Sequence, residues 1–275
     1  MNYYGFALPV TGFFIDENLS ASAFGRMLDE RRGALPVPVA QGMQNLMDSH
    51  DTDRLASMVV NGENHGNPHH IDYNNANSAV RSKTFKLRKP DDRERAIQRL
   101  IALFQMTFVG APMIYYGTEA GMWGGHDPDV RMPMVWADMK FAPQATDPRG
   151  GEREPDDVNF DPALYEFYKG AIALRRSRSA LSLGEYRQLG AFDDRKVFVF
   201  ERSFGDDALL VAINRGDAPQ TVDVPLSSGL ALAEARPLFV TRPDQTGGVS
   251  LTAGATTARI TLPPLTGAVF GKPSK

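Results

Sequence analysis

The sequence predicts an α/β fold in residues 1–178, followed by an all-β module in residues 179–275. In the first part, short apolar segments alternate with amphipathic helical patterns, which is typical of parallel β/α units. After residue 179, short strands are separated by turns rich in Gly, Asp and Pro, which indicates an antiparallel sandwich of about a hundred residues. The first part contains only two or three strands, whereas a closed (β/α)8 barrel needs eight strands and about 250 residues.

Three helices and two strands are predicted in the first part. Ser20 is a suitable N-cap for a helix that continues to Arg32. Pro90 and Asp91 open a second helix, in which apolar residues recur at three- and four-residue spacing before Gly110 ends it. A third helix covers residues 162–178. The segment 42–47 predicts a short buried strand, and the continuously apolar segment 113–116 predicts a strand that is buried on both faces of a parallel sheet. The stretches at 61–82 and 117–157 are polar and predict loops.

The second part is predicted to contain strands at residues 197–202, 208–213, 220–224 and 258–262. Their alternation with turn residues is the pattern of an antiparallel sheet. This module carries enough apolar residues for a core of its own, so we expect it to be stable alone. We place the domain boundary near residue 179.

Composition excludes several classes of function. The formal net charge is −3 and the pI is about 6.0, so no basic field is present to hold nucleic acid. No apolar run reaches the ~20 residues that a membrane-spanning helix needs. Because the chain contains no cysteine, disulfides, thiolate chemistry and cysteine-ligated zinc are excluded. These features fit a neutral substrate, and they leave the cellular compartment open.

The first motif is a burst of His, Asp and Arg directly after a predicted strand. Asp48, His50, Asp51 and Arg54 all follow the apolar pair at 46–47. Neighbouring His and Asp side chains can hydrogen-bond adjacent hydroxyls of a sugar, and Arg can orient a carboxylate with two hydrogen bonds. An ordinary Asp–Arg ion pair in a loop is the alternative for this motif alone.

A second, longer motif makes a resemblance specific. The string SHDTDR at 49–54 is followed by GAPMIYYGTEAGM at 110–122 and DPDVRMPMVW at 127–136. This order is similar to the last conserved blocks of the α-amylase family, glycoside hydrolase family 13. The GGHDP loop at 124–128 and the opening MNYYGF resemble neopullulanases, cyclomaltodextrinases and maltogenic amylases. The resemblance covers essentially the whole chain.

The resemblance implies a fold and a set of site residues. Residues 1–178 would be the C-terminal portion of a TIM (β/α)8 barrel, about strands 6–8, with the sixth strand ending at 1–3, the seventh at 43–47 and the eighth at 113–116. Asp51 would be the third essential carboxylate, which stabilises the transition state by binding two sugar hydroxyls. Five further residues are expected to bind substrate: His50, Arg54, Trp123, Asp127 and Arg131. Glu119 and Tyr116 are expected to hold these residues in position without contacting the substrate.

Alternatives remain for several of these residues. Asp127 and Arg131 could equally form a loop-fixing ion pair, and Trp123 could anchor its loop instead of stacking on a sugar. Thr118 stands where relatives usually carry Asp. The His-rich insert at 64–70 is expected to be a solvated loop and not a metal site. No cofactor or metal is predicted, because the calcium ligands of many family members come from upstream loops.

The family's other two carboxylates are missing from this sequence. Retaining glycosidases need two carboxyl groups about 5–5.5 Å apart, a nucleophile and a general acid/base. In this family they are an Asp in a G-x-R-x-D motif and a Glu, and the only similar string, at 151–154, lies in a loop. Residue 1 is therefore expected to be an internal methionine taken as a start, or the edge of a fragment.

The sequence thus predicts part of a retaining α-glucan hydrolase that cleaves α-1,4 bonds, and predicts that this chain alone is inactive. The expected substrates are maltodextrin, cyclodextrin or pullulan oligosaccharides. The expected protein partner is a second copy or a complementing N-terminal fragment, because a partial barrel leaves an open sheet edge. A non-catalytic carbohydrate-binding or regulatory remnant of the family is the alternative, and transglycosylation cannot be separated from hydrolysis by these residues.

Overall fold

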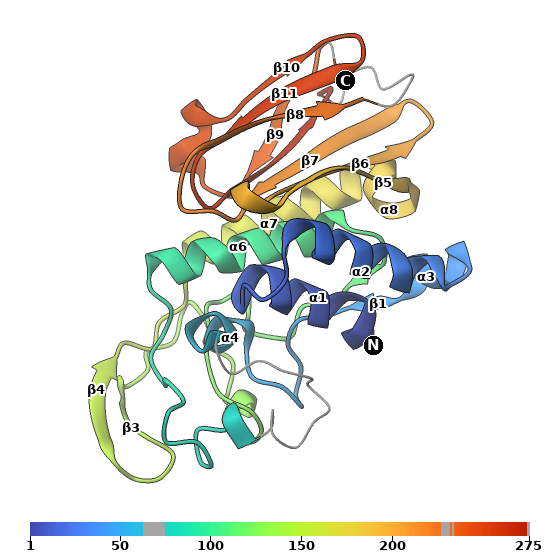
Figure 1. Ribbon diagram of the computed structural model, residues 1–275. Helices are drawn as coiled ribbons and strands as arrows, with labels where there is room; N and C mark the ends of the chain where they lie inside the picture. Colours follow the sequence, from blue (N-terminus) through green and yellow to red (C-terminus); the bar gives the residue numbers. More distant parts are fainter. Residues whose placement is uncertain (63–74, 227–231, 233, 274–275) are drawn as a thin grey trace.

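The computed structural model describes residues 1–62, 75–226, 232 and 234–273. Figure 1 shows three regions: the β-sheets of the C-terminal part at one end, a middle layer of helices, and a loop-rich end that carries a small hairpin. No helix within the described ranges combines the length and the apolar character needed to cross a bilayer.

The chain begins with helical turns instead of the end of a strand. Wide π-helical turns η1 (Tyr3–Ala7) and η2 (Thr11–Ile15) flank α1 (Leu8–Val10). The Asn2 side chain accepts a hydrogen bond from the Gly5 N–H at 3.1 Å, which favours the helical turn at this point. The predicted strand end at residues 1–3 is therefore wrong. Asn2 joins this segment to the strand residues Gln44 and Asn45: its N–H donates to Gln44 O at 2.8 Å, and its side-chain amide donates to Asn45 Oδ1 at 2.9 Å.

The parallel sheet of the first part has two very short strands. β1 (Gln44–Asn45) pairs in parallel with β2 (Ala111–Pro112), and helix α3 (Val37–Gly42) precedes β1. The strand predicted at 42–47 is therefore shortened, and the strand predicted at 113–116 is wrong, because these residues form no regular strand and the pairing lies just before them. Two backbone bonds join the segments: Ala111 N–H donates to Met43 O and Met113 N–H donates to Asn45 O, both at 2.8 Å. A strand with one neighbour is held by few hydrogen bonds, which accounts for the early end of β2.

The three predicted helices are confirmed within one or two residues. Helix α2 (Ala21–Gly33) starts after Ser20, whose hydroxyl accepts from Ala23 N–H at 3.2 Å. Helix α6 (Asp92–Thr107) starts with a capping box between Asp91 and Glu94. Helix α7 (Pro162–Ser177) is capped by Asp161, and the short helices α4 (Leu55–Val60) and α8 (Ser179–Leu183) complete the middle layer.

Two arginines from later in the chain donate hydrogen bonds to the backbone carbonyls at the C-terminal end of α6. Arg175 on α7 donates to Met106 O, Phe108 O and Gly110 O at 2.8, 3.2 and 2.5 Å. Arg202 donates to Thr107 O at 2.5 Å. The last carbonyls of a helix have no partner within the helix, and a positive charge there is favoured by the helix dipole. Two guanidinium groups supply both effects, in a helix with no basic residue in its own last turn.

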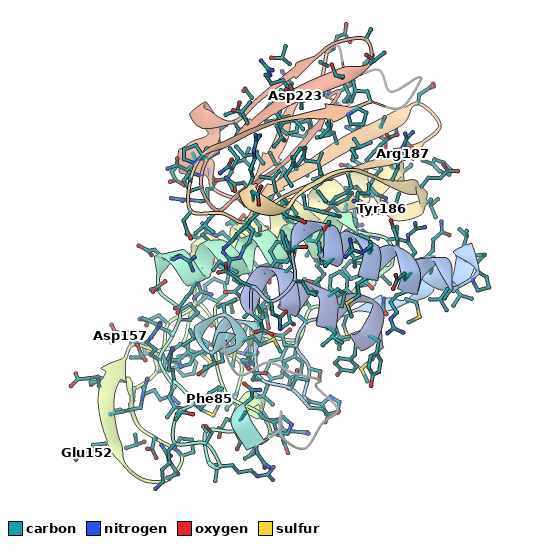
Figure 2. The ribbon with its side chains drawn as sticks, viewed as in Figure 1. Phe85, Glu152, Asp157, Tyr186, Arg187 and Asp223 are labelled. Carbon is teal, nitrogen blue, oxygen red and sulfur yellow. The ribbon has the colours of Figure 1, made fainter. Side chains whose placement is uncertain are left out.

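The long segment between β2 and α7 is more ordered than the sequence predicts. It contains the short 3₁₀ turn η4 (Asp129–Arg131) and a two-stranded antiparallel hairpin of β3 (Gln144–Thr146) and β4 (Glu152–Asp156). Figure 2 shows Glu152 on this hairpin, and Asp157 directly after it, at the end of the molecule opposite the large sheets. The loop predicted at 117–157 is therefore a hairpin in its second half, hidden in the sequence by polar strand residues.

The C-terminal part is a sandwich of two antiparallel sheets, as predicted. The larger sheet has the order β5-β6-β7-β12-β9, with turns η5 (Asp193–Arg195) and η6 (Pro243–Gly248) at its connections. The smaller sheet has the order β10-β11-β8. Four predicted strands are confirmed, and β5, β9, β10 and β12 were not predicted. The strands are β5 (Glu185–Phe192), β6 (Val197–Phe204), β7 (Asp207–Asn214), β8 (Gln220–Pro225), β9 (Arg236–Val240), β10 (Ser250–Ala253), β11 (Thr257–Leu262) and β12 (Thr266–Gly271).

The larger sheet is buried on both faces. One face packs on the smaller sheet through residues such as Leu210 and Phe270. The opposite face packs on the helices, where the Phe198 ring lies 5.0 Å from Phe24 and the Phe200 ring 5.8 Å from Phe104. Tyr186 joins the same junction, as Figure 2 shows, with its ring 5.1 Å from that of Phe108. The sandwich thus has a core of its own between its two sheets, as the sequence predicts, and it shares a second core with the helices.

Candidate functional site

The loops that follow β1 and β2 meet at one end of the parallel pair. Because parallel strands end at the same edge, residues after β1 and residues after β2 are neighbours. Two bonds join the loops directly: the Thr118 hydroxyl donates to an Asp48 carboxylate oxygen at 2.5 Å, and Arg54 donates to Tyr116 O at 2.6 Å. These bonds hold the candidate residues of the two motifs in one place.

An exposed cluster of charged side chains lies on these loops. The distance from His50 Nε2 to Asp51 Oδ1 is 3.2 Å, and that from Arg131 Nη2 to Asp51 Oδ1 is 3.9 Å. Arg131 also donates to Asp127 through Nε. All four side chains are about half exposed. We call His50, Asp51, Asp127 and Arg131 the Asp51 cluster. Its carboxylates can accept hydrogen bonds from hydroxyls, and its imidazole and guanidinium groups can donate them.

Arg54 lies elsewhere than the sequence predicts. Its side chain is fully buried, and its guanidinium donates to Tyr116 O at 2.6 Å and to Val130 O at 2.9 Å. The same group lies 4.9 Å from the Tyr115 ring centre and 4.8 Å from that of Tyr116, as in a cation–π contact. The predicted substrate contact of Arg54 is contradicted by this burial. Arg54 instead fixes the loops that carry Tyr116 and Arg131.

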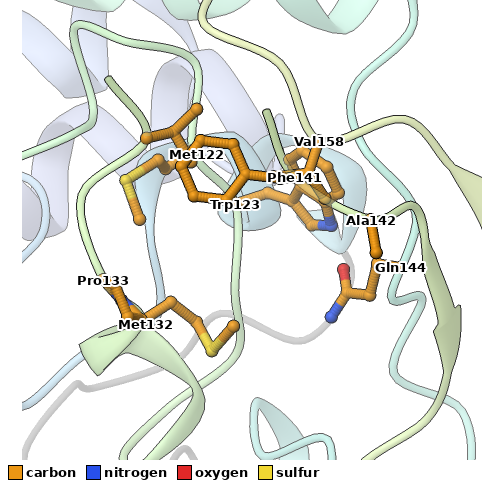
Figure 3. Close-up of a pocket in the computed structure, with 9 residues that line it drawn as sticks. Met122, Trp123, Met132, Pro133, Phe141, Ala142, Gln144 and Val158 are labelled. Atoms are coloured by element: carbon orange, nitrogen blue, oxygen red, sulfur yellow. The ribbon is translucent and has the colours of Figure 1, made fainter. Parts of the chain in front are cut away.

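Trp123 lies in the wall of a mainly apolar cavity of about 280 Å³ (Figure 3). Its neighbours there include Met132, which follows Arg131 of the Asp51 cluster, and Phe141. The indole Nε1 is buried and has no hydrogen-bond partner among the described residues. Whether Trp123 stacks on a sugar or anchors the loop stays a prediction. Tyr116 and Glu119 lie beside a second, larger cavity, and Tyr116 donates to Met132 O at 2.6 Å.

Comparison with known proteins connects this arrangement with one group of enzymes. No model of a known protein family matches the chain. Neopullulanase 2 of Thermoactinomyces vulgaris is 32% identical over 231 residues, which is 83% of this chain and 31% of the relative. A cyclomaltodextrinase of Geobacillus thermopakistaniensis is 31% identical over 225 residues, which is 82% of this chain and 30% of the relative.

A solved cyclomaltodextrinase structure is 26% identical and covers 98% of this chain and 36% of its own, with a TM-score of 0.67. The chain belongs to the α-amylase family. It spans about a third of the length of these relatives. The sequence match therefore corresponds to one segment of these longer relatives.

In this α-amylase-family chain, Asp48 has a role at the site that its place in the first motif did not predict. Its carboxylate is buried, and one oxygen accepts from Leu55 N–H at 2.9 Å as well as from Thr118. It therefore ties the loop that carries His50 and Asp51 to the start of α4 and to the loop after β2. Its place directly after the apolar pair 46–47, at the end of a buried strand, is the signal for such a role.

The carboxylate of Asp48 gives a pH prediction. Burial raises the pKa of Asp48 above its ordinary value of 3.8, although bonds from Leu55 and Thr118 and the charge of Arg54 oppose the rise. A raised pKa means that the folded protein holds this proton more tightly than the unfolded chain does. The contribution of Asp48 to stability is thus greatest below its ordinary pKa, and it is lost as pH rises toward the folded-state value.

We expect the protein with Asp48→Asn to lose less stability between about pH 4 and 7 than the unchanged protein does. The measurement is the free energy of urea unfolding across this range. Asp223→Asn is the control: Arg259 lowers the pKa of that exposed carboxylate, so this change acts mainly below about pH 4 and should leave the profile above it nearly unchanged. Identical pH profiles for Asp48→Asn and the unchanged protein would contradict the prediction.

Within the described ranges, no group of three or more histidine or acidic side chains is placed to hold a metal ion. The His-rich insert at 64–70 lies outside the residues that the structure describes.

Proposed function

We propose that the chain is part of an α-glucan hydrolase of the neopullulanase and cyclomaltodextrinase kind, which cleaves α-1,4 bonds with retention. In this proposal residues 1–178 are the last part of a (β/α)8 barrel, about strands 6–8, and residues 179–275 are its C-terminal sandwich domain. The names of the relatives support the substrate class. The observation that carries the proposal is the exposed Asp51 cluster at the carboxyl end of the parallel pair, where barrel enzymes place their active sites.

Each residue of the Asp51 cluster has a role in this proposal. Asp51 accepts hydrogen bonds from two hydroxyls of the sugar whose bond is cleaved, and His50 contacts the same sugar. Asp127 and Arg131 form a neighbouring subsite, where the guanidinium also holds Asp51 in position. Trp123 supplies an apolar surface. Arg54 and Asp48 touch no sugar; their hydrogen bonds fix the loop after β1 against the loop after β2.

Cleavage also needs two acids that this sequence does not provide. A retaining mechanism requires a nucleophile and a general acid/base about 5–5.5 Å apart across the bond. Loss of a nucleophile alone costs about 10⁶-fold in enzymes that depend on one. We therefore propose that residues 1–275 alone bind α-glucans without cleaving them. The missing acids would come from a complementing polypeptide segment, which would also cover the open edge of β2.

The test has a cleavage arm and a binding arm. Residues 1–275 should release no reducing sugar from maltodextrin, β-cyclodextrin or pullulan above a protein-free control. Maltohexaose should still bind in calorimetry, and Asp51→Ala should weaken that binding about tenfold, because hydrogen bonds to a charged group are lost. Asp223→Ala, an exposed carboxylate on the sandwich, is the matched control and should leave binding unchanged.

Two outcomes would contradict the proposal. Release of reducing sugar that Asp51→Asn abolishes would show that the chain is a complete catalyst. Equal binding by Asp51→Ala and Asp223→Ala would show that the Asp51 cluster does not contact the glucan.

A further inference from the structure

A second cavity, of about 610 Å³, is lined in part by Tyr116, whose hydroxyl donates to Met132 O, next to Arg131 of the Asp51 cluster. It is bounded by the segment after β2, by the turn at 134–137 and by the first turn of α7. Its volume falls in the range of about 300–1,000 Å³ that is usual for sites of small ligands. The residues that line it are Tyr116, Glu119, Met134, Trp136, Ala137, Phe160, Pro162, Tyr165 and Glu166.

Aromatic rings face solvent around this cavity. Trp136 is 55% exposed, Tyr116 is 39% exposed and Tyr165 is 37% exposed. The rings are held in place: Tyr116 by its hydrogen bond to Met132 O and its contact with Arg54, and Tyr165 by the Phe160 ring at 5.2 Å. Single exposed apolar residues are common on protein surfaces, but several fixed rings around one concavity indicate a ligand with flat apolar faces.

The polar groups of the cavity restrict the kind of ligand. One carboxylate oxygen of Glu119 is buried and has no hydrogen-bond donor among the described residues. A buried acceptor without a donor is costly, so the site lacks a donor that a ligand can bring. Glu166 pairs with Lys169 at 2.8 Å, but both side chains are more than half exposed, so this pair costs little to rearrange. The cavity thus offers flat apolar rings together with acceptors for hydroxyl groups.

The geometry points to this cavity as a second binding site for α-linked glucose chains, separate from the Asp51 cluster. A pyranose ring has an apolar face of C–H groups and a rim of hydroxyl donors, which match the rings and Glu119 respectively. Tyr116 connects the two places, because its hydroxyl bonds to Met132 O, next to Arg131. A chain that leaves the Asp51 cluster would reach Trp136 and Tyr165. The inference takes its substrate class from the proposed function, but it uses other residues.

Tryptophan fluorescence can report on this cavity alone. The chain has two tryptophans, so Trp123→Phe leaves Trp136 as the single reporter. In this background maltotetraose should shift the Trp136 emission to shorter wavelength in a saturable way, and cellotetraose, its β-linked isomer, should have little effect. Tyr165→Ala and Glu119→Gln should each weaken the apparent affinity about tenfold, and Asp51→Ala less than about threefold. Circular dichroism and the unfolding midpoint confirm that each variant is folded.

The outcomes separate the inference from the proposed function. Loss of the shift with Asp51→Ala but not with Tyr165→Ala would overturn the inference and leave the proposed function intact. The reverse pattern would support the inference and count against the role of Asp51. Calorimetric binding without any change at Trp136 would overturn the inference, and absence of binding by both methods would overturn both. A short-wavelength emission before sugar is added, in a concentration-dependent dimer, would show that protein covers the cavity and would also overturn it.

Discussion

A protein made of residues 179–275 alone should fail to form a stable monomer. Its larger sheet would expose a face that the helices cover in the whole chain, including Phe198, Phe200, Leu209, Val211 and Ile213. Burying one large apolar side chain is worth about 1.5–3 kcal/mol. Exposing this face therefore costs roughly 10 kcal/mol, which is comparable with the whole stability of a typical domain. We expect aggregation or a non-cooperative urea transition in circular dichroism, and strong binding of a hydrophobic dye.

A matched control uses the same fragment with polar residues on the helix-facing side only. Phe198→Ser, Phe200→Ser and Ile213→Thr leave the residues between the two sheets, such as Leu210 and Phe270, untouched. This fragment should be more soluble than the unchanged one, because it exposes less apolar surface. A compact monomer with a cooperative transition from the unchanged fragment, by sedimentation and urea unfolding, would contradict the shared core.

Arg54→Met should destabilise the chain by about 3–5 kcal/mol, because it removes one charge of a buried cluster and leaves its partners without compensation. The carbonyls of Tyr116 and Val130 lose their donor, and the buried carboxylate of Asp48 loses a nearby positive charge. The measurement is the urea midpoint at neutral pH, followed by circular dichroism and by tryptophan emission. Arg54→Lys should recover only part of the loss, since a single ammonium cannot reproduce the planar group that bonds two carbonyls and stacks on two rings.

Arg131→Met serves as the control for the loss of an arginine from the same loops. Arg131 is half exposed, so its removal should change stability by less than about 1 kcal/mol. The double change Asp48→Asn with Arg54→Met should cost less than Arg54→Met alone, because it removes the uncompensated carboxylate. Equal unfolding midpoints for Arg54→Met and the unchanged protein would show that Arg54 does not hold the loops together.

The predictions from sequence succeeded where local chemistry decides the structure. The helices at Ser20, Asp91 and Asp161 begin where a capping side chain precedes an apolar pattern, and the structure confirms them. The strand at 113–116 failed because a strand depends on hydrogen bonds to neighbours, which no local pattern contains. The hairpin of β3 and β4 was not predicted, because its strands consist largely of polar residues, which are typical of loops.

The candidate site was predictable to a similar degree. His50 and Asp51 are adjacent in the sequence and were grouped from it directly. The resemblance to the α-amylase family added Asp127 and Arg131, and the structure places these two beside Asp51. The burial of Arg54 could not be read from the sequence, because Arg beside His and Asp is equally compatible with a surface contact. Asp48 was part of the predicted motif, but its role was not predicted, because an acid is rarely fully buried and its partners Leu55 and Thr118 lie on different segments.

The arginines at the end of α6 also set an order of events during synthesis. Helix α6 is complete in sequence at Thr107, but the groups that satisfy its last carbonyls are Arg175 and Arg202. A growing chain emerges from the ribosome at about 5–20 residues per second, so these side chains appear seconds after the helix. Until Arg202 has emerged, the end of α6 depends on water for its hydrogen bonds. The native end of this helix can therefore form only after strand β6 has been translated, however early the rest of the helix begins to coil.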